Sequence, residues 1–335
     1  MNILYFLAES SSYMQQWQRF HMIDELQDSG HQVTVFNPLQ YSSLEEANEI
    51  LPALIRKNNP HFDVFVNPAP SAFLFKPTMQ KIKALGLPSV LICFDNLHAP
   101  YLHKDIAPFF DLVWLTSRET EYIFKNWGCT TIFRPYAANP NFFKPDFTGE
   151  IPRIGFIGTL YDDRVNRINR LTAASVPCSI YSDRLVRQGG PGPDKKLSKR
   201  EMLSLLVKLS RFSIGRKVAY GRIKNRLFGE SNRLIKNEYL DLLPSVPFEE
   251  MASIYSNHSL SLNITELRNT FNLKHPIHKL HLRTFEIPMC GGLQIAPYVE
   301  ELSHYFTDGE EIILCKDDQE FISKCHFYLK PENYS

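Results

Sequence analysis

Short apolar runs alternate with amphipathic segments along the first half of the chain. Compact hydrophobic runs predict β-strands at 2–8, 31–37, 62–67, 89–94, 111–116 and 130–136. Apolar residues at helical spacing predict helices at 17–26, 44–57, 77–86, over the residues before Phe110, and at 121–127. A strand followed by a helix and a second strand forms a unit in which the two strands run parallel. The pattern therefore predicts an open, doubly wound sheet.

A stretch rich in Pro and Asn at 137–152 lacks this periodicity and is typical of a linker. The alternation then resumes. Strands are predicted at 151–158, 178–182, 260–265, 293–298 and 311–315, with helices at 164–174, 248–258 and 281–292 and a closing helix. We therefore expect an α/β protein of two Rossmann-like doubly wound domains, 1–145 and 150–335, facing each other across a cleft.

Composition narrows the class of protein. A chain of 335 residues suits two domains, and a formal charge of +1 argues against a surface built for nucleic acid. The six cysteines form no closely spaced pairs, which predicts reduced, mostly buried thiols and no zinc or disulfide framework. The apolar start is short and lacks a basic leader, and no run approaches the ~20 apolar residues that span a bilayer. We expect a cytoplasmic protein.

One segment is strongly basic. Fifteen Lys or Arg residues lie within 184–236, against three acidic residues. Inside it, 201–212 places apolar residues at helical spacing with cations between them, as in an amphipathic helix on an anionic lipid surface. A solvated insertion at about 187–240, packed by one face on the second domain, explains the pattern equally well. The first interpretation predicts peripheral attachment at the inner face of the membrane.

The loop and helix at 264–292 combine cations with one acid. Arg268, His275, Lys279 and Arg283 precede Glu286, which stands in an apolar run before a Gly-Gly pair. Cations and free N–H groups at a helix start suit a diphosphate. A carboxylate one turn later can accept hydrogen bonds from the two vicinal hydroxyls of a ribose. The segment therefore indicates a nucleotide site. The histidines of this loop have irregular spacing and no completing acid or cysteine, so we expect no metal.

These residues carry a resemblance to a known family. The motif RTFEIPMCGG at 283–292, with LSLNIT before it and YVEELSHYF and GEEIILCKD after it, resembles the nucleotide-binding half of group 1 glycosyltransferases of GT-B fold. The block is most similar to the spore-maturation branch. CFDNLHAPY in the first domain is similar to that branch's Asp-x-x-His loop, here Asp95 and His98.

The resemblance implies metal-independent transfer of a sugar from a nucleotide diphosphate, expected to be a UDP-sugar, without a cofactor. The acceptor would be a glycan, a lipid-linked molecule or a protein, bound in the first domain during synthesis of a cell-surface glycan. By position, Glu286 corresponds to the ribose-binding acid and Arg283 to the arginine at the diphosphate. The remaining implied donor-site residues are Asn263 before the loop, Val246 and Pro247 beside the base, and Gly158 and Thr159 near the phosphates.

One departure from the family pattern qualifies the comparison. Relatives carry a second glutamate eight residues before the first, where this chain has His278, so the role of that acid toward the donor sugar is open here.

Asp95 and His98 follow a predicted strand. Either could remove the proton of an acceptor hydroxyl, and Asp95 could equally cap the next helix.

Three other functions remain open at this stage. A nucleotide-sugar epimerase shares the architecture, and a non-catalytic protein could bind a membrane through the basic segment. A nicotinamide-dependent oxidoreductase is disfavoured because AESSSY, after the first strand, lacks the G-x-G-x-x-G phosphate turn.

Overall fold

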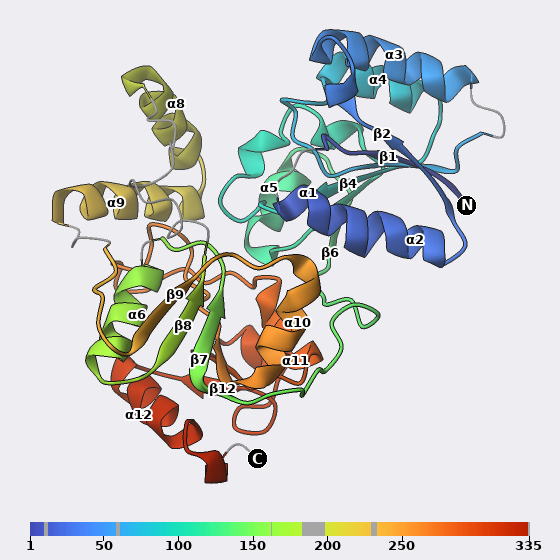
Figure 1. Ribbon diagram of the computed structural model, residues 1–335. Helices are drawn as coiled ribbons and strands as arrows, with labels where there is room; N and C mark the ends of the chain where they lie inside the picture. Colours follow the sequence, from blue (N-terminus) through green and yellow to red (C-terminus); the bar gives the residue numbers. More distant parts are fainter. Residues whose placement is uncertain (10–12, 58–60, 162, 183–197, 229–232, 334–335) are drawn as a thin grey trace. The chain divides into compact units, whose positions relative to one another are not determined.

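The computed structural model describes residues 1–9, 13–57, 61–161, 163–182, 198–228 and 233–333 (Figure 1). The chain divides into two compact units, Met1–Pro135 and Tyr136–Ser335. Each unit contains a six-stranded sheet in which all pairings are parallel. The predicted pair of doubly wound α/β sheets is confirmed.

The first sheet has the strand order β2-β1-β3-β4-β5-β6. Its strands are β1 (Asn2–Phe6), β2 (Gln32–Phe36), β3 (Val64–Asn67), β4 (Ser89–Cys93), β5 (Leu112–Leu115) and β6 (Thr131–Phe133). The order changes direction between β1 and β3. In open parallel sheets, ligands bind outside the carboxyl ends of the strands at such a point.

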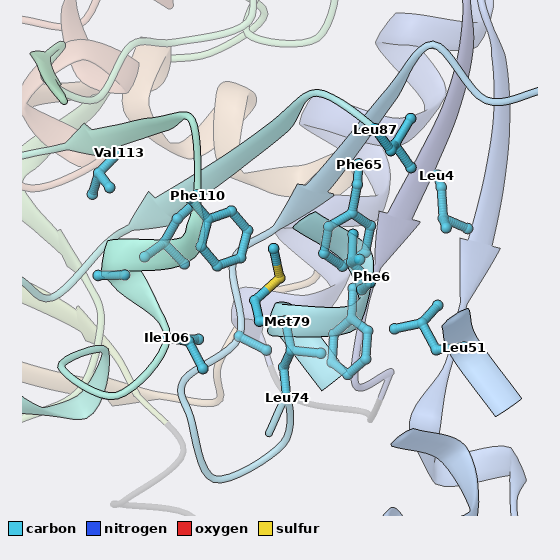
Figure 2. Packing of buried hydrophobic residues seen from close by; sticks show 14 of the residues in the cluster. Leu4, Phe6, Leu51, Phe65, Leu74, Met79, Leu87, Ile106, Phe110 and Val113 are labelled. Atoms are coloured by element: carbon cyan, nitrogen blue, oxygen red, sulfur yellow. The ribbon is translucent and has the colours of Figure 1, made fainter. Parts of the chain in front are cut away.

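Helices cover both faces of this sheet because successive side chains of a strand point to opposite sides. The elements are α1 (Tyr13–Gln18), a π-helix (Arg19–Asp24), α2 (Glu25–Asp28), α3 (Leu44–Lys57), α4 (Lys76–Ala84) and α5 (Glu121–Asn126). On β1, Leu4 and Phe6 pack with Leu51 of α3 and Met79 of α4 (Figure 2). The alternate side chains, Tyr5 and Leu7, pack with Ile23 on the other face.

The helix expected before Phe110 is absent. That segment instead forms two short 3₁₀ turns, Pro100–Leu102 and Ala107–Phe109. Pro100 and Pro108 each remove a backbone donor that an α-helix through this region would need, so the local sequence stops each turn early.

The second sheet has the order β12-β11-β10-β7-β8-β9. Its strands are β7 (Ile151–Ile157), β8 (Cys178–Tyr181), β9 (Leu240–Leu243), β10 (His258–Leu262), β11 (Gln294–Pro297) and β12 (Ile313–Cys315). The order reverses between β7 and β10. The loops after these two central strands are therefore the expected ligand loops of this unit.

The helices of the second unit are α6 (Asp163–Ala173), α8 (Lys199–Ser210), α9 (Ser213–Phe228), α10 (Phe248–Asn257), α11 (Arg283–Met289) and α12 (Asp318–Tyr328). The predicted amphipathic helix is α8, which begins with a capping box between Ser198 and Glu201. Helix α9 and strand β9 were not predicted. The cations at 184, 187, 195 and 196 lie outside the described residues.

All six cysteines are free and buried, as the sequence predicted. No helix in the described part of the chain is long and apolar enough to cross a membrane.

Candidate functional site

The loop after β7 and the first turn of α11 meet at Gly158. This glycine has φ 145°, a conformation that side chains rarely adopt. A Cβ built on it would lie 2.5 Å from Nη2 of Arg283. The Arg283 guanidinium also lies over the Phe156 ring, 4.7 Å from its centre. The absence of a side chain at Gly158 thus lets Arg283 sit against the end of β7.

Arg283 has a further property that fits anion binding. Its Nη1 is buried and has no hydrogen-bond partner within the described residues. A buried guanidinium N–H without an acceptor is unfavourable, and a phosphate oxygen would supply that acceptor.

Two more arginines gather around the ring of Tyr161, in the same loop. The Arg164 guanidinium is 4.0 Å and that of Arg268 is 5.5 Å from the ring centre. Arg164 also donates to the carbonyl of Thr159 at 2.8 Å and lies 5.7 Å from the Phe156 ring. Arg164, Arg268 and Arg283, with the rings of Phe156 and Tyr161, are called the arginine cluster below. Three nearby cations create a positive potential that favours a multiply charged anion.

Tyr161 and Arg164 were missed by the sequence analysis. Both lie in GTLYDDR, directly after the strand that ends in GFIG. The available signal was an aromatic residue and a cation at the start of the helix that follows a central strand. Their contact with Arg268 joins residues about a hundred positions apart, and local periodicity carries no information on such a pairing.

Glu286 lies on α11, one turn after Arg283, and is almost fully buried, with 1% of its surface exposed. Its charge acts on two neighbours. Burial raises the pKa of the Tyr255 hydroxyl, Glu286 raises it further, and Arg283 lowers it. Burial and then Glu286 raise the pKa of the Cys290 thiol to about 12. Glu286 and Arg283 therefore share one electrostatic environment, which suits a ligand that offers hydroxyls to one and phosphate to the other.

Asn263 follows β10, and its side chain is fully buried and forms hydrogen bonds inside the second unit. Its Nδ2 donates to the hydroxyl of Thr284 at 3.1 Å and to Oε1 of Gln294 at 3.3 Å. The Thr284 hydroxyl in turn accepts from the backbone N–H of His281 at 3.2 Å. Asn263 thus holds the first turn of α11, which carries both Arg283 and Glu286.

The base of the loop after β10 is held by charged and polar contacts. Oε1 of Glu266 lies 2.9 Å from Nη2 of Arg167, and both side chains are largely buried. Nδ1 of His278 forms a hydrogen bond of 2.9 Å with the Thr265 hydroxyl. Burial lowers the pKa of His278 although Glu266 opposes the shift, so this histidine is neutral near pH 7.

The other predicted donor residues occupy varied positions. Lys279 is buried, and its Nζ lies 5.7 Å from the Tyr136 ring centre. His275 is exposed on the same loop. Val246 and Pro247 lie in the loop between β9 and α10, and β8 separates β9 from β7 in the sheet.

In the first unit, Asp95 and His98 lie in the turn after β4. Asp95 is exposed and His98 is partly buried. Between them, Asn96 is fully buried and fastens the turn to the loop after β5. Its Nδ2 donates to the Ser117 carbonyl at 2.6 Å and the Thr120 hydroxyl at 2.8 Å. The turn thus presents the Asp95 carboxylate at the surface on a fixed backbone.

A buried histidine lies beyond this turn. Burial lowers the pKa of His103 to about 4, although the charge of Asp95 opposes the shift. His103 is therefore neutral at pH 7 and carries no charge that would pair with Asp95.

No group of three or more His, Cys, Asp or Glu side chains that could hold a metal ion occurs within the part of the chain that the structure describes.

Comparison with known protein families gives a match within the second unit. A family model described as "Glycosyl transferase-like" matches residues 211–334, which include Asn263, Arg268, Arg283 and Glu286. No curated protein sequence matches the chain.

Solved structures resemble the whole chain. A sucrose-phosphate synthase from Thermosynechococcus elongatus superposes with a TM-score of 0.56 at 14% identity, covering 100% of this chain and 91% of that one. An α-glucosyltransferase in complex with UDP and DNA gives 0.58 at 12% identity, covering 100% and 92%. Anabaena HepE in complex with UDP and glucose gives 0.54 at 11% identity, covering 99% and 90%. These likenesses show that the fold is that of the GT-B glycosyltransferases.

Proposed function

We propose that this protein is a glycosyltransferase that moves a sugar from a nucleotide diphosphate, with UDP-sugars as the favoured donors, to an acceptor hydroxyl. One observation carries the proposal: the arginine cluster and Glu286 lie together at the point where the second sheet reverses its strand order. The family match covers Arg268, Arg283 and Glu286. Two of the similar structures contain UDP, which supports the donor class.

The chemistry follows from the charges. The acceptor oxygen bonds to C1 of the sugar as the bond from C1 to the β-phosphate oxygen breaks, and that oxygen keeps the electron pair. The diphosphate thereby gains negative charge. The cations of the arginine cluster bind this charge more strongly in the transition state than in the bound donor, which lowers the barrier. The acceptor proton must pass to a base, and we propose Asp95 for this role, with His98 as the alternative.

Within the donor site, we propose that Glu286 accepts hydrogen bonds from the ribose hydroxyls and that Arg283 binds the diphosphate. Gly158 and Thr159 line the phosphates, and Arg268, His275 and Lys279 contribute to the site from the loop after β10. The base lies against the backbone at Val246 and Pro247. Asn263 acts as a positioning residue for α11, because its amide holds Thr284 and Gln294.

The test uses Glu286→Gln with two ligands, UDP and 2′,3′-dideoxy-UDP. Calorimetry should show that wild type binds UDP more tightly, and that Glu286→Gln removes this preference because a neutral amide is a weaker acceptor. Acceptor-dependent release of UDP from a UDP-sugar then identifies transfer. Interconversion of sugar epimers without an acceptor would identify an epimerase, and absence of nucleoside diphosphate binding would refute the donor site.

The basic segment supports a second element of the proposal, attachment to the inner face of the membrane. On α8, Leu203 and Val207 are exposed, and on α9 the same holds for Tyr220, Ile223 and Leu227. Exposed cations surround them at 199, 200, 208, 211, 216, 217 and 226. Apolar side chains beside cations suit an anionic bilayer, where the former enter the headgroup layer and the latter meet phosphate.

Vesicle co-sedimentation tests this attachment. We expect binding to vesicles that contain phosphatidylglycerol, little binding to phosphatidylcholine alone, and a decrease with salt. The pair Leu203→Ser and Leu227→Ser should weaken binding, whereas Phe327→Ser, which removes an exposed ring from α12, should not. Equal binding to neutral vesicles would refute an electrostatic attachment.

A further inference from the structure

Helix α9 passes extremely close to the loop after β10. A Cβ built on Gly221 would lie 1.8 Å from the carbonyl oxygen of Asn269, which is closer than a real Cβ can approach. Asn269 itself has φ 68°, in the left-handed region. The glycine therefore allows the helix backbone to touch the loop backbone at the residue that follows Arg268.

A second contact lies one turn further along α9. Nζ of Lys224 donates to the backbone carbonyl of Asn272 at 2.6 Å, and the Asn272 side-chain amide hydrogen bonds to that of Asn225. The helix thus contacts the loop at two points, Asn269 and Asn272.

Hydrogen bonds within the loop connect these two contact points to its base. The Leu267 N–H donates to the Ile277 carbonyl at 2.6 Å, which closes the loop at its base. The Thr270 hydroxyl donates to the Leu267 carbonyl at 2.7 Å and accepts from the Ile277 N–H at 3.1 Å. A displacement of Asn269 by α9 would therefore move Arg268 relative to Tyr161 and the rest of the arginine cluster.

We propose that α9 is a positioning element of the donor site, which sets the place of Arg268 and hence the affinity for a nucleoside diphosphate. This proposal rests on the donor site proposed above. Gly221 and Lys224 form the face of α9 toward the loop, whereas Tyr220, Ile223 and Leu227 are exposed. A surface helix outside the donor loops thus governs the site without touching the nucleotide.

The central test compares Lys224→Met with Lys217→Met. Both variants lose one cation from α9, but Lys217 is exposed on the helix surface whereas Lys224 binds the loop. Lys224→Met should weaken UDP binding by about threefold to thirtyfold and speed amide hydrogen exchange at Leu267, Thr270 and Leu273. Measured without lipid, Lys217→Met should change neither. Lys224→Arg, which can still reach the Asn272 carbonyl, should restore both.

A glycine pair provides an independent arm. Gly221→Ala should speed exchange of the loop, because its Cβ meets the Asn269 carbonyl. Gly215→Ala on the same helix places its Cβ 2.1 Å from the carbonyl of Leu209, at the end of α8, and should leave the loop unchanged. Far-ultraviolet circular dichroism checks folding, and the lysine pair decides the question if a glycine variant fails to fold.

The two readouts separate this proposal from the donor site. If loop exchange is the same in Lys224→Met and Lys217→Met, the positioning role of α9 is refuted, whatever the affinities. If wild type binds no UDP although Lys224 governs loop exchange, the donor site is refuted while the mechanical link between α9 and the loop stands.

Discussion

Removal of the Arg283 guanidinium should selectively weaken binding of the phosphate part of a nucleotide. Arg283→Met retains an unbranched chain that can still pack on Phe156, so the change removes mainly charge and hydrogen-bond donors. The guanidinium is stacked on Phe156, and its Nη1 has no hydrogen-bond partner among the residues that the structure describes, so the group is suited to bind an anion. A hydrogen bond between charged groups contributes about 1.5–3 kcal/mol, which corresponds to a loss of about 10-fold to 150-fold in affinity.

Calorimetric titration with UDP and with uridine measures this effect. The affinity for UDP should fall by the stated factor and that for uridine should remain, because uridine has no phosphate. Arg283→Lys should be intermediate, since it keeps the charge and loses the bidentate fork. Arg56→Met, at an exposed site at the end of α3 in the other unit, controls for net charge. Equal losses for UDP and uridine, or no loss for UDP, would refute the assignment.

Three further predictions concern stability. Burial lowers the pKa of His103 to about 4 in the folded protein. Below about pH 6.5 the histidine is protonated in the unfolded chain but stays neutral in the folded protein until the pH approaches 4. The free energy of unfolding should therefore fall by up to about 3 kcal/mol between pH 6.5 and 4. Denaturant titrations should show a smaller fall in His103→Leu, and an unchanged fall would contradict this cause. Glu266→Gln should destabilise the second unit by about 1–3 kcal/mol because Arg167 loses its buried carboxylate and keeps only the more exposed Asp318, at 3.3 Å, and adding Arg167→Met should recover part of the loss. Asn96→Ala should destabilise the first unit by about 2–3 kcal/mol through its lost hydrogen bonds without changing UDP affinity, so equal thermal stability with wild type would show that the turn after β4 needs no such anchor.

The periodic elements of both sheets were predictable because burial imposes a local rhythm. The runs that form β1 and β4 are largely apolar on both faces, as expected when helices cover both sides. Helix α9 escaped prediction for a physical reason. Its inner face starts with Ile214 and Val218 but continues with a glycine that touches backbone and a lysine that binds a carbonyl, so the apolar stripe is short. Proline explains the opposite error, since Pro100 and Pro108 prevent the residues before Phe110 from forming a continuous α-helix.

The residues of the candidate site also differ in how far the sequence could predict them. Glu286 and Arg283 stood out because a carboxylate and a cation in an apolar helix require an explanation within a single segment. Tyr161 and Arg164 can be recognised as site residues only from the fold, which brings Arg268 to the ring of Tyr161. Asn263 was correctly placed at the end of its strand, but sequence could not reveal that its amide faces Thr284.

Helix α9 has a consequence for the timing of the reaction. One side of it contacts the loop after β10, which we propose binds the donor, and the other carries the exposed apolar residues proposed to meet lipid. Linkage is reciprocal, so if lipid changes the affinity for nucleotide, nucleotide must change the affinity for lipid by the same factor. Depletion of the donor pool would then alter how long the protein dwells on the bilayer, and residence there would follow the supply of activated sugar.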